Sequence, residues 1–258
     1  MTQLFSKSAD TALRVLLIGG TIGTVVVFGA IFTMVRSADF TSQNVTIEQT
    51  VPFSHHHHVN DIGIDCRYCH QSVETSAVAG VPPTQVCMNC HRELWKQSDM
   101  LAPVRASWKD NQPLVWNRVH DLPDYVYFNH SIHLHKGIGC YECHGRIDEM
   151  PLTRQAAPLT MQWCLECHRD PEQHVRPRSL VFKPKPLEEL TQTDEFLAAL
   201  LRSGTRQVST NADEAKGILA NSTRRNDDID DDIIAKLRRQ LSADYHLDKR
   251  TDCTTCHR

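Results

Sequence analysis

The sequence of 258 residues has few aromatic residues, no large imbalance of charge, and no cysteine outside one repeated pattern. The length allows one large domain or two ordinary ones. Aromatic residues make up 7% and apolar residues 40%, which is little for a hydrophobic core that would stabilise a chain of this size by itself. A bound apolar group is therefore expected to supply the missing bulk. The formal net charge of −3 gives no indication of a nucleic-acid-binding surface.

All ten cysteines fall into five C-x-x-C pairs, and a histidine follows each pair directly. C-x-x-C-H is the attachment signal for c-type haem, in which both thiols add to the haem vinyl groups and the histidine ligates the iron. The sequence therefore predicts five covalently bound haem c groups. The five signals, numbered in chain order, use Cys66 and Cys69, Cys87 and Cys90, Cys140 and Cys143, Cys164 and Cys167, and Cys253 and Cys256.

Zinc is the main alternative for these cysteines, because the gaps from Cys69 to Cys87 and from Cys143 to Cys164 fall within zinc-ribbon spacing. However, zinc needs only four ligands and does not require a histidine after each pair. The fifth pair would also lack a partner pair. Redox disulfides are a weaker alternative, and haem attachment is the preferred interpretation.

An uncharged run from Val15 to Val35 lies between Arg14 and Arg36. A helix of this length spans a membrane and exceeds the apolar region of a cleavable signal peptide. We expect an uncleaved anchor at 15–36, although Ser37-Ala38 leaves cleavage open, with 1–14 in the cytoplasm and a linker at 37–52. Because c-type haem is attached outside the cytoplasm, the sequence predicts a single-pass inner-membrane protein whose bulk is periplasmic.

An internal repeat divides the remainder of the chain. Phe53-Ser54-His55 with His58 matches Phe128-Asn129-His130 with His133, and the first and second signals match the third and fourth. We expect a di-haem module with its connector at 53–127, a second module at 128–170, and an extension at 171–258 that carries the fifth haem. Within the extension, 171–186 is expected to be extended, 187–201 helical, 203–230 a loop and 233–239 helical.

The signals supply five proximal histidines directly, and the repeat supplies most of the distal candidates. Histidines three residues apart on a helix diverge by about 60°, so each can serve a different haem. If every iron has two histidine ligands, none is open to a substrate. The proximal residues are His70, His91, His144, His168 and His257, and the distal candidates are His55, His58, His120, His130 and His133.

Several residues near the signals have less certain roles. His57 is an alternative to His55, whereas His135, His174 and His246 have no partner in the repeat. We expect Met88 and Met161 to pack rather than to ligate iron. The arginines beside the signals are expected either to pair with haem propionates or to be solvated; these are Arg67, Arg92, Arg146 and Arg169.

F-x-H-x-x-H followed by two haem signals resembles the class III and c7 multihaem cytochromes. The N-terminal anchor, the doubled module, the run Arg118-Val119-His120-Asp121-Leu122-Pro123 and the last signal more closely resemble the pentahaem cytochrome c subunit of alternative complex III. Menaquinone reductase multihaem subunits share much of the pattern but usually carry one more signal. The resemblance implies a mostly α and irregular, haem-packed fold with two di-haem modules and a C-terminal fifth haem.

That resemblance also implies a function and partners. The subunit would relay electrons within a quinol-oxidising respiratory complex toward a cytochrome c acceptor, without catalysing a reaction itself. The implied partners are a large iron–sulfur subunit related to molybdopterin enzymes, polytopic quinol-binding membrane subunits and a monohaem cytochrome c. Two alternatives are a stand-alone quinol dehydrogenase of the NapC/NrfH type and a catalytic multihaem enzyme with an open iron.

Electron paramagnetic resonance of the oxidised protein tests the ligand count. Five irons with two histidine ligands each should give low-spin signals throughout. A major high-spin signal would contradict the expectation that every iron is six-coordinate and would favour a catalytic enzyme.

Overall fold

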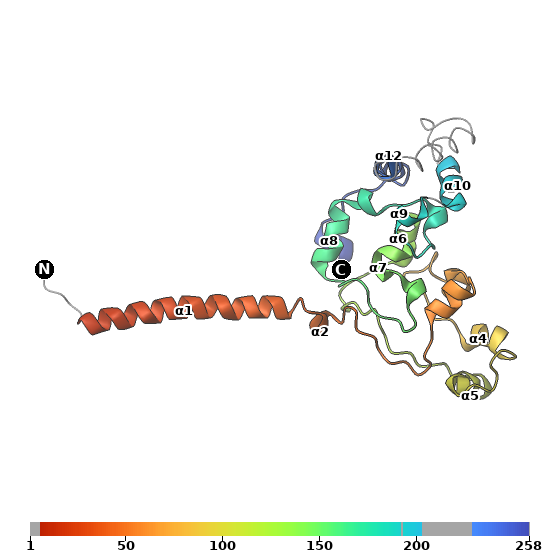
Figure 1. Cartoon of the computed structure of the whole chain (residues 1–258), viewed down its shortest axis with the longest axis horizontal. Helices are drawn as coiled ribbons and strands as arrows, with labels where there is room; N and C mark the ends of the chain where they lie inside the picture. Colours follow the sequence, from red (N-terminus) through yellow and green to blue (C-terminus); the bar gives the residue numbers. More distant parts are fainter. Residues whose placement is uncertain (1–5, 192, 203–228, 258) are drawn as a thin grey trace.

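The computed structural model describes residues 6–191, 193–202 and 229–257, and these residues form a long N-terminal helix attached to a compact helical body (Figure 1). Most helices are short, and β structure in the described residues is limited to isolated bridges such as Gln43–Gln155. The α-helices are α1 Lys7–Met34, α2 Ala38–Thr41, α3 Cys66–Cys69, α4 Thr84–His91, α5 Ala102–Asp110, α6 His130–His135, α7 Cys140–His144, α8 Met161–Arg169, α9 Leu187–Leu190, α10 Asp194–Arg202, α12 Ile229–Asp244 and α13 Cys253–Cys256. Single turns of 3₁₀-helix lie at Asp99–Leu101, Ile147–Glu149, Pro171–His174 and Arg178–Leu180, and a π-helical segment at His56–Asp61.

Helix α1 projects away from the body and makes no core (Figure 1). The segment Ser8–Met34 has a mean hydropathy of 2.3 and is 0% buried, so its apolar side chains all face outward. At 1.5 Å per residue, the 28 residues of α1 are about 42 Å long, which exceeds a hydrocarbon core of about 30 Å. The helix could therefore serve as a membrane anchor or as a signal segment.

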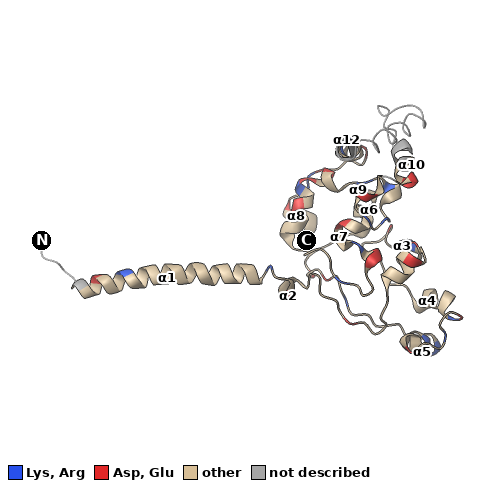
Figure 2. Ribbon diagram, viewed as in Figure 1, with Lys and Arg blue, Asp and Glu red and all other residues tan. Residues whose placement is uncertain are grey.

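Charged residues are concentrated away from the apolar part of α1 (Figure 2). The helix begins eight residues before the expected start of the anchor, and its polar end carries an ion pair between Asp10 and Arg14 at 3.0 Å. Ser6 caps this end by accepting a hydrogen bond from the backbone N–H of Ala9. At the other end, Arg36 lies over the Phe32 ring at 3.6 Å.

The segment after α1, expected to be a linker, is held against the second module. Gln43 and Thr46 form isolated bridges with Gln155 and Arg154, and the Gln43 side chain donates to the Ala156 carbonyl at 2.7 Å. These contacts place residues 43–46 beside residues 154–156.

The largest apolar core lies in the C-terminal extension. Helices α9, α10 and α12 pack together with the turns at 171–180, and the buried side chains are Val175, Leu180, Leu187, Leu190, Phe196, Ala199, Ile234, Leu237 and Leu241. Full burial of an aliphatic side chain stabilises a fold by about 1.5–3 kcal/mol. The extension therefore has a conventional core, whereas the second cluster of buried apolar residues, in the region of the first two haem signals, is small and consists of Val51, Met88 and Val104.

The expectations for the extension need correction at two places. The segment 171–186 is not simply extended, because proline-led 3₁₀ turns occupy Pro171–His174 and Arg178–Leu180. The helix expected over 187–201 is interrupted between α9 and α10, where the Thr191 and Thr193 hydroxyls donate to carbonyls three residues earlier and Thr193 accepts from the Phe196 N–H. The helix expected over 233–239 lies within the longer α12. Most of the loop expected over 203–230 lies outside the described residues.

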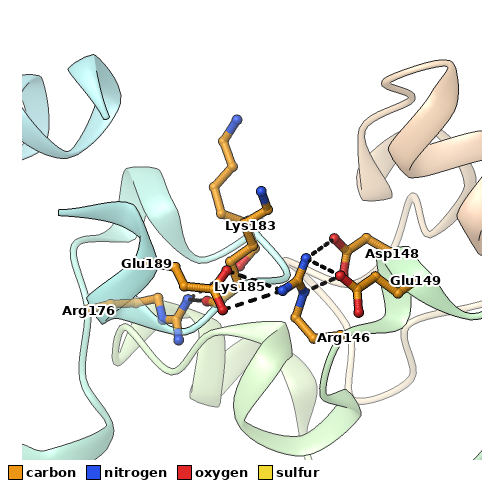
Figure 3. Close-up of polar contacts among 7 residues, drawn as sticks. All are labelled: Arg146, Asp148, Glu149, Arg176, Lys183, Lys185 and Glu189. Atoms are coloured by element: carbon orange, nitrogen blue, oxygen red, sulfur yellow. Dashed lines mark hydrogen bonds and ion pairs between the residues drawn. The ribbon is translucent and has the colours of Figure 1, made fainter. Parts of the chain in front are cut away.

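Arg176 is buried in the body with 1% of its surface exposed. Its guanidinium donates to the carbonyls of Lys183 and Lys185, as Figure 3 shows, and to the Glu142 carboxylate at 2.8 Å. Its Nε has no hydrogen-bond partner and lies 2.5 Å from the position that a Cβ at residue 139 would occupy. Glycine at 139 is therefore required by the close approach of Arg176.

Gly139→Ala should lower the free energy of unfolding by about 1–3 kcal/mol, because the added methyl overpacks a guanidinium that its hydrogen bonds hold in place. Chemical denaturation followed by circular dichroism measures the change. Gly29→Ala is the matched control, since a Cβ there meets no atom within 4 Å. Equal stability of the two variants would contradict the packing argument.

Candidate haem-binding sites

Each C-x-x-C-H signal lies on a single helical turn. Helices α3, α7 and α13 consist of little more than the signal itself, whereas the second and fourth signals lie within the longer α4 and α8. Pro83 precedes α4, and Thr160 caps α8 by accepting from the Trp163 N–H. The prolines and threonines that precede the second signal of each module therefore mark helix starts.

Histidines of the repeat meet histidines of the signals in facing pairs. Because a metal–nitrogen bond is about 2 Å long, two imidazoles on opposite faces of one iron have ring centroids roughly 6 Å apart. His58 and His91 are 6.1 Å apart, and the equivalent pair in the second module, His133 and His168, is 6.2 Å apart. These separations fit pairs of axial ligands.

The other two repeat histidines lie toward the first signal of each module. His130 and His144 have nearly parallel rings whose centroids are 6.5 Å apart. For His55, the equivalent of His130, the charge on His70 is one of the effects that lower its pKa, after burial. The structure thus brings three of the five expected distal histidines, His58, His130 and His133, to about the expected separation from a proximal histidine of their own module.

The phenylalanines of the two modules position these histidines in the same way. Phe53 stacks on His58 with centroids 4.4 Å apart, and Phe128 stacks on His133 at 4.5 Å. Each phenylalanine also meets the earlier histidine of its module edge-on, at 4.9 and 4.8 Å. The F-x-H-x-x-H spacing is therefore a packing unit as well as a source of ligands.

Backbone carbonyls determine the tautomers of many of these rings. Nδ1 of His58 lies 2.8 Å from the Ser54 carbonyl oxygen, and Nδ1 of His133 lies 2.7 Å from that of Asn129. A carbonyl can only accept, so Nδ1 carries the proton and Nε2 keeps its lone pair for a metal. The same arrangement joins His70 to Gly80, His91 to Leu94, His130 to Ala77, and His257 to Tyr125.

Burial keeps several of these rings neutral. It lowers the pKa of His144 to about 3 and that of His55 to about 4, with smaller effects from neighbouring histidines. Burial also lowers the pKa values of His58, His120 and His133. A neutral imidazole is the form that ligates a metal, so the environment favours the required protonation state.

His120 is placed differently from the other expected distal ligands. Its Nε2 lies 3.2 Å from Nδ1 of His144, and the ring centroids are 4.4 Å apart, too close for opposite faces of one iron. The described ring contact of His257 is with Tyr125, at 5.7 Å. The structure therefore brings His120 to the third signal, and among the described residues no histidine ring faces His257.

His174 satisfies one condition for a ligand although the repeat gives it no partner. Its Nδ1 lies 3.0 Å from a carboxylate oxygen of Glu142, which leaves Nε2 free. Burial opposes ionisation of Glu142, but hydrogen bonds from His174 and Arg176 lower its pKa. Glu142 lies between the two cysteines of the third signal. An acidic residue at that position is the sequence feature that could have pointed to a histidine partner such as His174. His57 also has an oriented ring, stacked on Trp95 with Nδ1 near Asp61.

The remaining predicted roles have mixed outcomes. Met88 is buried in a small core, as expected, whereas Met161 is 67% exposed and does not pack as expected. Arg146 is paired rather than simply solvated, because it binds Asp148, Glu149 and Glu189, as Figure 3 shows. Arg67 pairs with Asp65 at 2.8 Å.

The donor set fits haem better than zinc. Within the described residues, no three or more His, Cys, Asp or Glu side chains gather as a metal site. A zinc ion needs about four protein ligands, whereas an iron already held by four porphyrin nitrogens needs two. Histidines that meet in pairs, each beside a C-x-x-C turn, are the arrangement that haem requires.

Comparison with known proteins agrees with this donor set. Over 98 residues the chain is 36% identical to a protein of Nitratidesulfovibrio vulgaris (strain Hildenborough) named menaquinone reductase, multihaem cytochrome c subunit. The alignment covers 38% of this chain and 46% of the relative, so the chain spans less than half of that protein. The similarity supports a multihaem cytochrome c. No protein-family model matches the chain.

The surroundings of His55 offer a test of ring orientation at the first signal. His55 Nδ1 lies 3.0 Å from the Thr153 hydroxyl, the one side-chain hydroxyl that orients a repeat histidine in the described residues. Thr153→Val removes the hydroxyl with little change of volume. Because a hydrogen bond contributes about 0.5–1.5 kcal/mol, one haem potential should rise by up to about 60 mV. The rise follows from weaker electron donation by a ligand that has lost its acceptor.

Spectroelectrochemical titration measures this shift. Thr75→Val is the control, because the exposed Thr75 hydroxyl bonds only the Ser72 carbonyl, at 3.4 Å. Unchanged potentials in Thr153→Val, with all haems retained, would contradict a role for Thr153 in orienting an iron ligand.

Proposed function

We propose that this protein is a membrane-anchored electron-transfer subunit with five covalently bound haem c groups, whose bulk lies on the periplasmic side. The observation that carries the proposal is the pairing of imidazoles at about the separation of two ligands on one iron. Three such pairs are 6.1, 6.2 and 6.5 Å apart. An iron with two histidine ligands has no position for a substrate, so its role is to accept and donate electrons.

The proposed residue roles are those that the sequence pattern predicts. The ten signal cysteines bind the haems, and His70, His91, His144, His168 and His257 are the proximal ligands. His55, His58, His130 and His133 are the distal ligands of the two modules. His120 is proposed as the fifth distal ligand on sequence grounds only, and its contact with His144 makes this the weakest assignment.

We further propose that the subunit works in a quinol-oxidising complex similar to alternative complex III, with a cytochrome c as acceptor. Its partners would be the iron–sulfur, quinol-binding and monohaem cytochrome subunits that the resemblance implies. The outward-facing apolar helix and the doubled module with a lone C-terminal signal support this reading. The subunit itself would relay electrons rather than catalyse quinol oxidation.

A second candidate is a subunit of a complex that reduces menaquinone, and the similarity to a menaquinone reductase subunit favours it. The two candidates use the same haem-binding residues but opposite directions of electron flow. The NapC/NrfH-type quinol dehydrogenase remains a third possibility, in which the chain would oxidise quinol alone.

Purification from native membranes in a mild detergent distinguishes these candidates. Mass spectrometry should find an iron–sulfur subunit and polytopic partners, and quinol should reduce the haems only while those partners are present. Reduction of menaquinone by pre-reduced haems, without haem reduction by quinol, would favour the menaquinone reductase reading. Quinol oxidation by the isolated chain would contradict both and favour the NapC/NrfH type.

A further inference from the structure

The first and third signals meet at the centre of the body. The backbone N–H of Cys140 donates to the Val181 carbonyl at 3.1 Å, and the Cys66 thiol lies 3.6 Å from the carbonyl of the next residue, Phe182. The two accepting carbonyls belong to adjacent residues, so Cys66 and Cys140 lie close together. Cys66 and Cys140 are equivalent residues of the repeat, so the modules meet through their corresponding first cysteines.

Two further contacts between the modules are reciprocal. The N–H of His56 donates to the Met150 carbonyl at 3.1 Å, and the N–H of Ser131 donates to the Ser76 carbonyl at 3.2 Å. His56 is equivalent to Ser131, and Met150 is equivalent to Ser76. Such an exchange of equivalent contacts is the mark of an isologous interface, which here relates two halves of one chain by approximate two-fold symmetry.

The second and fourth signals lie on the outer sides of this interface. Helix α6 carries His130, which faces the third signal, and His133, which faces the fourth. In the first module, His58 faces the second signal. A hydrogen bond of 3.1 Å between Asn89 and the Tyr68 hydroxyl also links the second signal to the first.

The fifth signal continues the series beyond the fourth. The N–H of Tyr127 donates to the Cys256 carbonyl at 2.9 Å, and His257 bonds the Tyr125 carbonyl. The residue after Tyr127 is Phe128, which stacks on His133, and His133 faces His168 of the fourth signal. The fifth signal is thus held on the segment that leads into Phe128, which stacks on the histidine that faces the fourth signal.

From these contacts we infer that the five haem-binding signals are arranged in the order second, first, third, fourth, fifth, so that electrons enter and leave this chain at its second and fifth signals. The inference rests on the proposed function. It differs from the order in sequence because the approximate two-fold axis passes between the first and third signals.

The two ends face different surroundings. Arg36, at the end of the apolar helix, lies 3.4 Å from Gln162 on the fourth-signal helix α8. Helices α4 and α5, around the second signal, lie on the side of the body away from α1 (Figure 1). The fourth and fifth signals therefore lie toward the membrane and fit exchange with a quinone-linked membrane partner. The second signal fits exchange with a water-soluble redox protein.

Photoinduced electron injection from either end tests the order. Met100→Cys places a thiol near the second signal, and Lys249→Cys places one near the fifth; both native side chains are exposed. A thiol-reactive ruthenium(II) complex is attached at one of these positions. Each flash transfers one electron from the excited complex to a ferric haem, and a sacrificial amine reduces the resulting ruthenium(III).

Methionine ligation marks individual haems as electron acceptors. His58→Met, His130→Met and His133→Met should raise the potential of the haem at the second, third and fourth signals respectively. Ferric haem with a methionine ligand has a near-infrared band that is lost on reduction, so the loss of that band times the arrival of the electron. Electrons from position 100 should reach the second, then the third, then the fourth signal. From position 249 the arrival order should reverse.

Two kinds of failure are distinguishable. A protein that carries five low-spin haems but shows the same arrival order from both labels would overturn the inferred arrangement alone. Missing haems or high-spin irons in the unmarked protein would instead overturn the proposed function. If the His130→Met protein lacks the haem at the third signal, electrons from position 100 must stop after reducing the haems at the second and first signals. Reduction of further haems would overturn the order.

Discussion

The site depends on one repeated interaction, the hydrogen bond between a histidine Nδ1 and an oxygen of the chain. Because the carbonyls of Ser54, Gly80 and Asn129 can only accept, they hold the proton on Nδ1 and leave Nε2 available. The bond also sets the angle of each ring. The facing pairs depend on this constraint. A freely rotating imidazole would not keep its Nε2 directed toward the second imidazole of the pair, whose ring centroid lies about 6 Å from its own.

The C-terminal extension and the first module are stabilised in different ways. The C-terminal extension buries conventional aliphatic residues such as Leu187, Leu237 and Leu241. The region of the first module buries few, and its order depends on hydrogen bonds, aromatic stacking and the apolar groups that the signals are suited to bind. The extension thus supports the second module, through Val175 against Ile138 and through the Arg176–Glu142 ion pair.

The approximate two-fold symmetry of the two modules determines which haem-binding signals are neighbours. Duplication of a di-haem unit in tandem alone would leave the two units side by side in any orientation. The reciprocal bonds from His56 to Met150 and from Ser131 to Ser76 select an orientation in which the first signals meet. A continuous series of neighbouring sites then extends through both modules, and the fifth signal lengthens it at the end nearer α1.

Local sequence determined the chemistry of the individual sites. The C-x-x-C-H turns, the F-x-H-x-x-H spacing, the apolar N-terminal run and the duplication are short-range patterns, because a haem signal needs only one helical turn and a spanning helix only its own residues. The expected helix around Ile233–Arg239 was also accessible from sequence. Tertiary structure decided everything that joins distant residues: the contact of His120 with His144, the Glu142–His174 pair, the carboxylates around Arg146 and the meeting of Cys66 with Cys140. These contacts depend on how the modules and the extension pack against one another, and no local spacing encodes that packing.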